Sequence, residues 1–199
     1  MERGFYDGLP PVILASKSPR RAELLRGMGV RFEVVGSDVD EGEAGRGVPL
    51  ERLPERLAKC KAEAVAAQCV GKMVIGADTL VLMDGEPLHK PRGSTEACEV
   101  LRKLSGRVHR VLTGVCISYD GECESFTACT EVCFRTLLPV EIDYYVHTFS
   151  PYDKAGGYGI QEWIGMVGVS WIRGSYTNVV GLPTEALSER LSHHIMQDR

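Results

Sequence analysis

Short apolar runs alternate with polar, helix-like segments over the first half of the chain. Three of these runs are predicted to be buried strands: residues 11–16, 32–36 and 73–77. A helix is expected to begin at Ser18-Pro19, because Ser is a favoured N-cap and Pro is favoured at the first helical position. A second helix is expected over 49–69, and the polar pair Asp78-Thr79 is expected to end the third strand.

The second half of the chain is patterned as hairpins and further helices. Asp84-Gly85 and Asp120-Gly121 are hairpin turn sequences, which predict a hairpin over 80–88 and a second one that joins strands at 108–119 and 122–136. The remaining predictions are helices at 94–105, from Pro139 and from Thr184, loops at 37–47 and 153–161, and a strand pair near 166–180. This mixture of elements predicts an α/β fold with a mixed sheet.

The composition is that of an ordinary globular protein, with 44% apolar and 25% charged residues. The formal net charge of -4 argues against a nucleic-acid partner, because such proteins usually carry a basic face. No apolar run reaches the ~18 residues of a membrane span, and the N-terminus is not patterned as a signal peptide. The seven cysteines lack zinc-type spacing, so we expect free thiols in a soluble, cytoplasmic protein.

The segment Ser16–Arg21 is a candidate phosphate site. The start of a helix offers free backbone N–H groups and the positive end of the helix dipole, and Arg20 and Arg21 stand in the first turn. Arginine makes bidentate contacts to phosphate. The alternative is a capped surface helix with solvated basic residues. Cations at a helix start oppose the dipole, however, and this opposition favours a bound anion.

Acidic residues supply candidate metal ligands and a candidate base. Asp78 is expected at the carboxyl end of a strand, where α/β sheets bind ligands, and a carboxylate there can hold a metal or activate water. The alternative is a turn-forming Asp78, with Thr79 continuing the turn. Asp38, Asp40 and Glu41 form an acidic cluster that is either a solvated loop or, with Asp78, a source of ligands for a hard cation such as Mg2+.

Two lysines are candidate phosphate contacts. Lys61 falls on or beside the apolar stripe of the helix predicted at 49–69, where a lysine is unusual, and Lys90 precedes a proline. Each could instead be a lysine that buries its stem and keeps its charge in water. The chain has no P-loop, dinucleotide fingerprint, nucleophile elbow or H-E-x-x-H motif.

The candidate residues fall within a series of motifs that resembles the Maf family from about residue 11 to 190. The series is S-x-S-P-R-R at Ser16–Arg21, D-V-D-E ending at Glu41, L-A-K-x-K-A at Leu57–Ala62, G-A-D-T at Gly76–Thr79, K-P at Lys90–Pro91, L-S-G-R at Leu104–Arg107, D-K-A-G-G-Y-G-I-Q at Asp153–Gln161 and V-V-G-L-P at Val179–Pro183. One such motif would be weak, but this many in the right order make a specific resemblance.

The resemblance implies a mixed twisted sheet with flanking helices in two lobes around a central cleft, as in inosine triphosphate pyrophosphatases. Residues 11–199 would form a single domain, and residues 1–10 an extension without an assigned role. It also implies hydrolysis of a nucleoside triphosphate to its monophosphate and pyrophosphate. Water would attack the α-phosphate with the help of a divalent cation, Mg2+ or Mn2+. The resemblance further suggests a homodimer.

The resemblance also implies a role for each matching residue. Asp78 would accept the proton of the attacking water and, with Glu41, bind the metal. The substrate-binding residues would be Ser16, Ser18, Arg20, Arg21, Lys61, Thr79, Lys90 and Gln161. Gln161 would select the base, because relatives with the G-I-Q sequence prefer thymidine and uridine nucleotides.

The chain departs from the family pattern directly after Gln161. Relatives usually have glycines there, whereas this chain has Glu162-Trp163-Ile164, which could alter base preference or product release. Two other functions remain open. One is a noncatalytic, nucleotide-binding regulator of cell division, as the older family name, septum formation inhibitor, suggests. The other is a phosphatase that releases phosphate one unit at a time.

Overall fold

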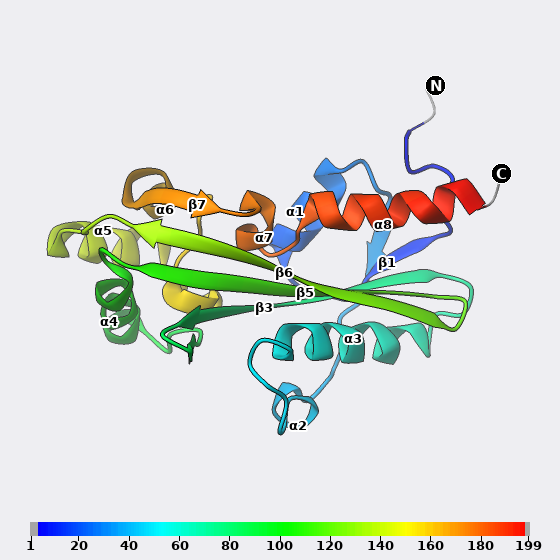
Figure 1. The fold of residues 1–199 in the computed structure, drawn as a ribbon, viewed down its shortest axis with the longest axis horizontal. Helices are drawn as coiled ribbons and strands as arrows, with labels where there is room; N and C mark the ends of the chain where they lie inside the picture. Colours follow the sequence, from blue (N-terminus) through cyan, green and yellow to red (C-terminus); the bar gives the residue numbers. More distant parts are fainter. Residues whose placement is uncertain (1–3, 198–199) are drawn as a thin grey trace. The chain divides into compact units, whose positions relative to one another are not determined.

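A computed structural model describes residues 4–197, and their strands form one mixed sheet (Figure 1). The strands are β1 (Val12–Leu14), β2 (Phe32–Val34), β3 (Met73–Met83), β4 (Glu86–Leu88), β5 (Val108–Tyr119), β6 (Glu122–Phe134) and β7 (Val169–Arg173). Their order within the described residues is β2-β1-β3-β5-β6-β7, and β4 pairs with β3. β1 is parallel to β2 and β3, whereas the β3/β4 and β6/β7 pairs are antiparallel.

Helices flank this sheet, which confirms the predicted α/β class. They are α1 (Pro19–Gly27), α2 (Glu41–Ala44), α3 (Leu53–Ala66), α4 (Ser94–Leu104), α5 (Pro139–Phe149), α6 (Trp163–Gly168), α7 (Tyr176–Val180) and α8 (Thr184–Gln197). Two short 3-10 helices, η1 (Pro151–Asp153) and η2 (Ala155–Gly157), occupy the Gly-rich loop. The central cleft stays a prediction.

The chain divides into two compact units. The first contains the residues up to Asp78, Thr113–Ala128 and the residues from Gly181, and the second contains Thr79–Leu112 and Cys129–Val180. The single domain over 11–199 stays a prediction. Residues 1–3 of the expected N-terminal extension lie outside the described range, but Tyr6 hydrogen-bonds Ser188 of α8 at 2.5 Å.

In the first unit, alternate strand residues face two different layers of helices. Val12 and Leu14 of β1 pack with leucines of α1 and α8, whereas Ile13 packs with Ala58 and Ala62 of α3. The same alternation continues in β3 and β5, because successive side chains of a strand point to opposite faces. Figure 1 accordingly shows α3 and α8 on opposite sides of the strands.

The second unit has its own apolar core. Residues of α4, α5 and α6 pack around Phe134 of β6 and Tyr158 of the Gly-rich loop. A smaller cluster joins Val81, Val111 and Val132 from three strands. Each unit therefore has a separate set of buried apolar contacts that holds its polar residues in place.

Three expectations about the elements are wrong. Asp78-Thr79 does not end a strand, because β3 continues through both residues to Met83. The expected acidic loop contains the short helix α2, which Asp40 caps by accepting the N–H of Glu43 at 3.0 Å. The expected strand pair near 166–180 is a helix, one strand and a second helix, namely α6, β7 and α7. In each case contacts distant in sequence or a local cap outweigh the simple pattern.

Gly76 lets α3 lie directly against β3. A Cβ at this position would stand 2.3 Å from the carbonyl oxygen of Ala58 and 2.9 Å from the backbone nitrogen of Ala62. No side chain fits in that space, so the helix backbone itself covers the strand. This close contact sets the distance between α3 and β3, and therefore between Lys61 of the helix and Asp78, which lies two residues after Gly76 in the strand.

The structure also bears on thiols and membranes. All seven cysteines are free, as predicted: Cys60, Cys69, Cys98, Cys116, Cys123, Cys129 and Cys133. Among the described helices there is none that combines the length and the apolar character needed to span a bilayer.

Candidate active site

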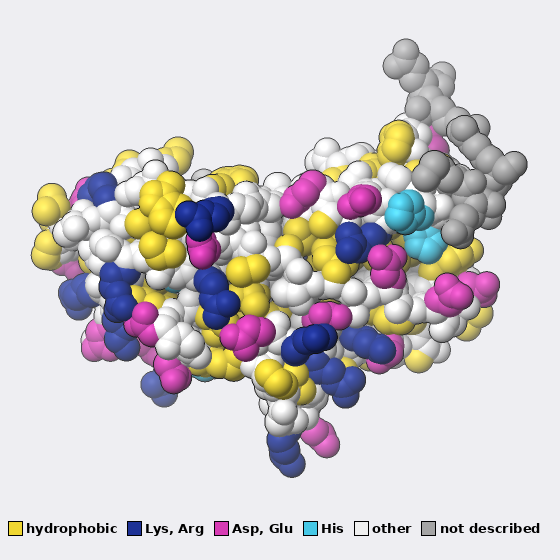
Figure 2. Space-filling model, in the orientation of Figure 1, with side chains coloured by type: hydrophobic (Ala, Val, Ile, Leu, Met, Phe, Trp, Pro, Cys, Tyr) yellow, Lys and Arg dark blue, Asp and Glu magenta, His cyan; other side chains and the backbone are white. Residues whose placement is uncertain are grey.

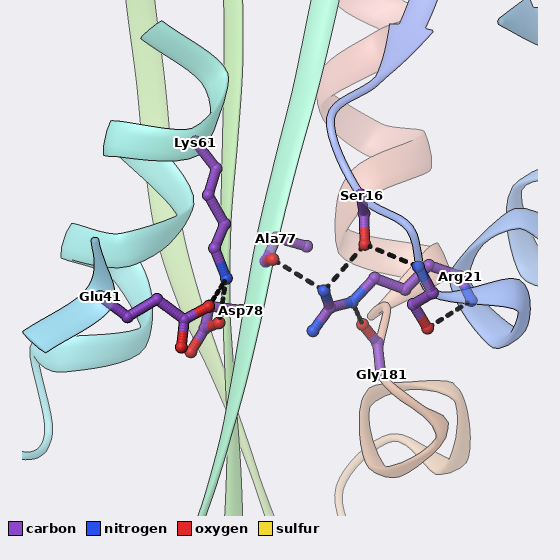
Figure 3. A network of polar contacts seen from close by, with 8 residues as sticks. Ser16, Arg21, Glu41, Lys61, Ala77, Asp78 and Gly181 are labelled. Atoms are coloured by element: carbon purple, nitrogen blue, oxygen red, sulfur yellow. Dashed lines mark hydrogen bonds and ion pairs between the residues drawn. The ribbon is translucent and has the colours of Figure 1, made fainter. Parts of the chain in front are cut away.

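Lys61 joins two carboxylates from different elements of the first unit. Its Nζ lies 2.6 Å from Oδ1 of Asp78 in β3 and 2.6 Å from Oε1 of Glu41 in α2 (Figure 3). Residues 41, 61 and 78 are far apart in sequence, and the packing of α3 on β3 brings them together. The predicted position of Lys61 on the inward side of its helix is confirmed, since its side chain is only 11% exposed.

The environment of Asp78 favours a protonatable carboxylate. Its side chain is 16% exposed, and burial raises its pKa, while the nearby Lys61 ammonium acts in the opposite direction. Burial is the larger effect. A carboxylate with a raised pKa is a stronger base than a free Asp, so Asp78 is suited to accept a proton from water.

Arg21 is held by acceptors from three segments of the first unit. Its Nη1 donates to the carbonyl oxygen of Ala77 at 2.8 Å and to Oγ of Ser16 at 3.1 Å, and its Nε donates to the carbonyl oxygen of Gly181 at 2.9 Å. Figure 3 shows this guanidinium on the other side of β3 from Lys61. Burial lowers the pKa of Arg21, and the negative charge of Asp78 opposes that shift.

The start of α1 has the predicted cap. Ser18 is the N-cap and accepts the N–H of Arg21 at 3.5 Å, and Pro19 follows at the first helical position. Ser16 is buried and accepts the N–H of Ser18 at 3.2 Å. The first turn contains no acidic residue and carries Arg20 and Arg21, so this helix start is strongly cationic.

The oxygen donors present fit a hard divalent cation. Glu41 and Asp78 are the two carboxylates that Lys61 brings together, and Mg2+ commonly binds one or two carboxylates together with substrate phosphates and water. Residues 4–197 contain no group of three or more His, Cys, Asp or Glu side chains that could hold a metal by themselves. A cation here would therefore take oxygens of the substrate or of water to complete its ligands.

The other predicted site residues belong to the second unit. Thr79 is half-buried in β3, and Lys90 and Gln161 are exposed. Lys90 lies in a segment that borders the Gly-rich loop, because the N–H of Gly156 donates to the carbonyl oxygen of His89 at 3.4 Å. Gln161 is the last residue of that loop.

Sequence reasoning missed two features. It had no means of finding the carbonyl groups of Ala77 and Gly181 that bind Arg21, since backbone acceptors leave no mark in a sequence. It noted Glu162 as unusual but did not predict the partners of its carboxylate, which are Tyr145 and Lys154. The departure from the family pattern was the one feature of the sequence that drew attention to Glu162.

Comparisons with known proteins give one consistent result. The family Maf, described as Maf-like protein, matches residues 11–194. A dTTP/UTP pyrophosphatase of Porphyromonas gingivalis is 44% identical over 183 residues, covering 90% of this chain and 92% of the relative. Proteins of the same name from Phocaeicola vulgatus and Bacteroides thetaiotaomicron are 46% and 47% identical, covering 90% and 88% of this chain and 94% and 92% of their own lengths.

Among solved structures, the Ham1 protein of Staphylococcus aureus has a TM-score of 0.47 and 20% identity, covering 62% of this chain and 71% of its own. A likeness at this level says nothing about function. The family match and the sequence relatives each extend over nearly the whole chain. The chain belongs to the Maf-like protein family.

Proposed function

We propose that this protein hydrolyses dTTP or UTP to the monophosphate and pyrophosphate. The observation that carries the proposal is the largely buried Asp78 carboxylate paired with Lys61, in the same unit as the cationic start of α1. The names of the relatives, dTTP/UTP pyrophosphatases at 44–47% identity, support the same reaction and the same substrates. Together these observations favour an enzyme over a noncatalytic regulator, which would need no buried base.

Each candidate site residue of the first unit has a role in this reaction. Asp78 accepts the proton of the water that attacks the α-phosphorus, and Lys61 keeps this carboxylate in place. Ser16, Ser18, Arg20 and Arg21 bind phosphate oxygens through hydroxyl, backbone N–H and guanidinium groups. Phosphoryl transfer depends mostly on positioning and on neutralising charge, which these groups provide.

A divalent cation is part of the proposal. Glu41 and Asp78 would hold Mg2+ or Mn2+ together with oxygens of the substrate. When bound, the cation supplies charge neutralisation between the phosphates and the carboxylates and makes water more acidic. Lys61 would then release at least one of its two carboxylates, because its ammonium occupies the position between Glu41 and Asp78 where the cation would bind.

The residues of the second unit would act on the rest of the nucleotide. Lys90 would neutralise phosphate charge, Thr79 would contact substrate and Gln161 would bind the base. A uracil or thymine edge presents the O4 acceptor beside the N3–H donor, and the amide of Gln161 can answer both. Cytosine presents the reverse pattern, so discrimination requires that the amide is held in one orientation.

We further propose a cytoplasmic enzyme without a nucleic-acid partner. Seven free thiols are typical of a reducing compartment. On the face shown in Figure 2, basic and acidic side chains are interspersed rather than gathered into one basic surface. This pattern supports a small anionic substrate over a polynucleotide. The homodimer stays a prediction.

The product of the reaction tests the proposed function. The purified protein would be incubated with dTTP, UTP, CTP, ATP and GTP, and pyrophosphate and phosphate would be measured separately. We expect pyrophosphate and monophosphate in equal amounts, with dTTP and UTP the best substrates. Stepwise release of phosphate would indicate a phosphatase, and binding without turnover would indicate a regulator.

A further inference from the structure

Gln161 lies in a turn that is closed by a backbone hydrogen bond. The N–H of Glu162 donates to the carbonyl oxygen of Gly159 at 3.0 Å, so Ile160 and Gln161 form the middle of a four-residue turn. Gln161 is exposed. Among the described residues little else holds its amide, so the direction of that amide depends on the groups of the turn that lie against it and on how firmly the turn is held.

One hydroxyl group of α5 binds both ends of the turn. The N–H of Gly159 donates to the hydroxyl oxygen of Tyr145 at 3.0 Å, and the same hydroxyl donates to Oε2 of Glu162. Tyr145 is fully buried, so the hydroxyl is a fixed point. Burial, and then the bond to Glu162, raise the pKa of Tyr145, which keeps the phenol protonated and able to donate.

A lysine holds the other oxygen of the Glu162 carboxylate. Nζ of Lys154 lies 3.0 Å from Oε1 of Glu162 and 2.8 Å from Oδ1 of Asp153. The side chains of Lys154 and Glu162 are 10% and 20% exposed, so this pair is only weakly screened by water. Removing Lys154 would leave the largely buried Glu162 carboxylate without a cation, which is costly, whereas removing Glu162 would leave Lys154 with Asp153 as its partner.

The turn is also tightly packed. A Cβ added at Gly159 would stand 2.9 Å from Cδ of Glu162 and 3.0 Å from Nε2 of Gln161. The Glu162 carboxyl group and the Gln161 amide therefore both lie against the Cα of Gly159. Any movement of the Glu162 side chain changes the surroundings of that amide.

We propose that Glu162 is a positioning residue that, through Tyr145 and Lys154, holds the turn so that Gln161 presents its amide in one orientation to the pyrimidine base. The inference rests on the proposed function. An amide that can rotate freely suits cytosine as well as uracil, because it exchanges its donor and acceptor ends on rotation. A turn fixed at both ends removes part of that freedom before the nucleotide binds.

The first test measures base discrimination. We expect Glu162→Ala and Tyr145→Phe each to lower the ratio of kcat/KM for UTP to that for CTP by about tenfold, which corresponds to one oriented hydrogen bond. Most of the change should come from KM for UTP. Glu162→Gln keeps a carbonyl acceptor for Tyr145 and should recover part of the ratio. Tyr144→Phe is the matched control. It removes the hydroxyl of a half-exposed tyrosine next to Tyr145 in the chain and should keep the ratio.

The double variant Tyr145→Phe/Glu162→Ala separates positioning from general damage. If both residues act through one contact, the UTP-to-CTP ratio of the double variant should be no lower than the lower of the two single-variant ratios. Independent effects would instead multiply. An unchanged ratio in Glu162→Ala, or a loss that multiplies in the double variant, would overturn the proposal.

A second measurement does not depend on activity. Hydrogen exchange of the peptide covering 158–163 should be faster in Glu162→Ala than in the wild type and in Tyr144→Phe. Equal exchange would overturn the positioning role even for an active enzyme. A different outcome is that the wild type releases no pyrophosphate from any nucleotide while Glu162→Ala still exchanges faster than the wild type. That outcome would overturn the proposed function and the role in base selection, and would support only the structural effect of Glu162 on the turn.

Discussion

At the scale of single residues, Arg21 has structural contacts in addition to its predicted contact with phosphate. Arg21 is bound by Ser16, Ala77 and Gly181, so it joins three segments of the first unit. We expect Arg21→Ala to lower the free energy of unfolding by about 1–3 kcal/mol, because buried acceptors lose their donor. Arg20→Ala should weaken triphosphate binding by about 1.5–3 kcal/mol, because it removes one charge-assisted contact to phosphate.

Urea denaturation and equilibrium binding of UTP and uridine would check both values. Binding would be measured in an inactive Asp78→Asn background. A fully stable Arg21→Ala protein would mean that the three contacts contribute little to folding. Equal losses of UTP and uridine affinity in Arg20→Ala would place this arginine on the base or sugar instead of the phosphates.

In the proposed reaction, Asp78 is the residue on which the chemistry depends most. Asp78→Asn removes the proton acceptor but keeps the size of the side chain, so kcat for dTTP should fall by ~10²–10⁴. UTP affinity should change much less. Asp38→Asn, an exposed carboxylate in the same acidic segment as Glu41, is the matched control and should keep its rate. Near-normal pyrophosphate release by Asp78→Asn would remove Asp78 from the mechanism.

At the scale of elements, the contact of α3 with β3 decides whether Lys61 meets Asp78. Gly76→Ala would place a methyl group 2.3 Å from the carbonyl oxygen of Ala58, so the helix must move away. We expect a loss of about 1–3 kcal/mol in stability, as for an overpacked core, together with a lower kcat. Gly27→Ala, where an added Cβ meets nothing within 4 Å, is the control and should keep both.

Urea unfolding and steady-state kinetics would show whether the two losses occur together. A destabilised Gly76→Ala protein with a normal kcat would mean that the position of α3 matters for folding alone. The distance from Lys61 to Asp78 would then not limit catalysis.

At the scale of the whole molecule, the balance of charge predicts a need for metal. Glu41 and Asp78 carry two negative charges, and Lys61 neutralises one of them. A triphosphate approaching the remaining charge is repelled unless a cation lies between them. EDTA should therefore abolish pyrophosphate release, and Mg2+ or Mn2+ should restore it. Undiminished turnover after thorough chelation would show that the arginines and lysines suffice.

The core of the second unit predicts how the stability of the protein depends on pH. His109 is buried against Tyr158, at 2.7 Å from Nε2 to the hydroxyl, and burial lowers its pKa to about 4. The unfolded chain takes up this proton near pH 6.5. Stability from the neutral imidazole is thus complete above pH 6.5 and is lost as pH falls toward 4, by up to about 3 kcal/mol.

Urea denaturation of the wild type and of His109→Phe at pH 7, 5.5 and 4.5 would measure this contribution. The variant should lose less stability than the wild type over the same range, because it has no group to protonate. Parallel pH profiles would mean that the slope comes from the carboxylates instead.

The local pattern of the sequence predicted much of the fold. The strand before Ser16, the Ser18 cap and the helix that follows depend on neighbouring residues, and all are confirmed. The free thiols and the inward position of Lys61 also follow from spacing. The site roles rest on the resemblance to the Maf family and stay predictions.

Tertiary structure decided what local pattern could not. By itself the sequence determined the elements that caps, turns and apolar spacing define, because these depend on residues a few positions apart. It could not place Asp78 inside a strand, because the largely buried carboxylate is stabilised there by Lys61, which belongs to the helix α3. Nor could it bind Arg21 to backbone carbonyls or tie Glu162 to Tyr145, because these partners meet only when the chain is folded.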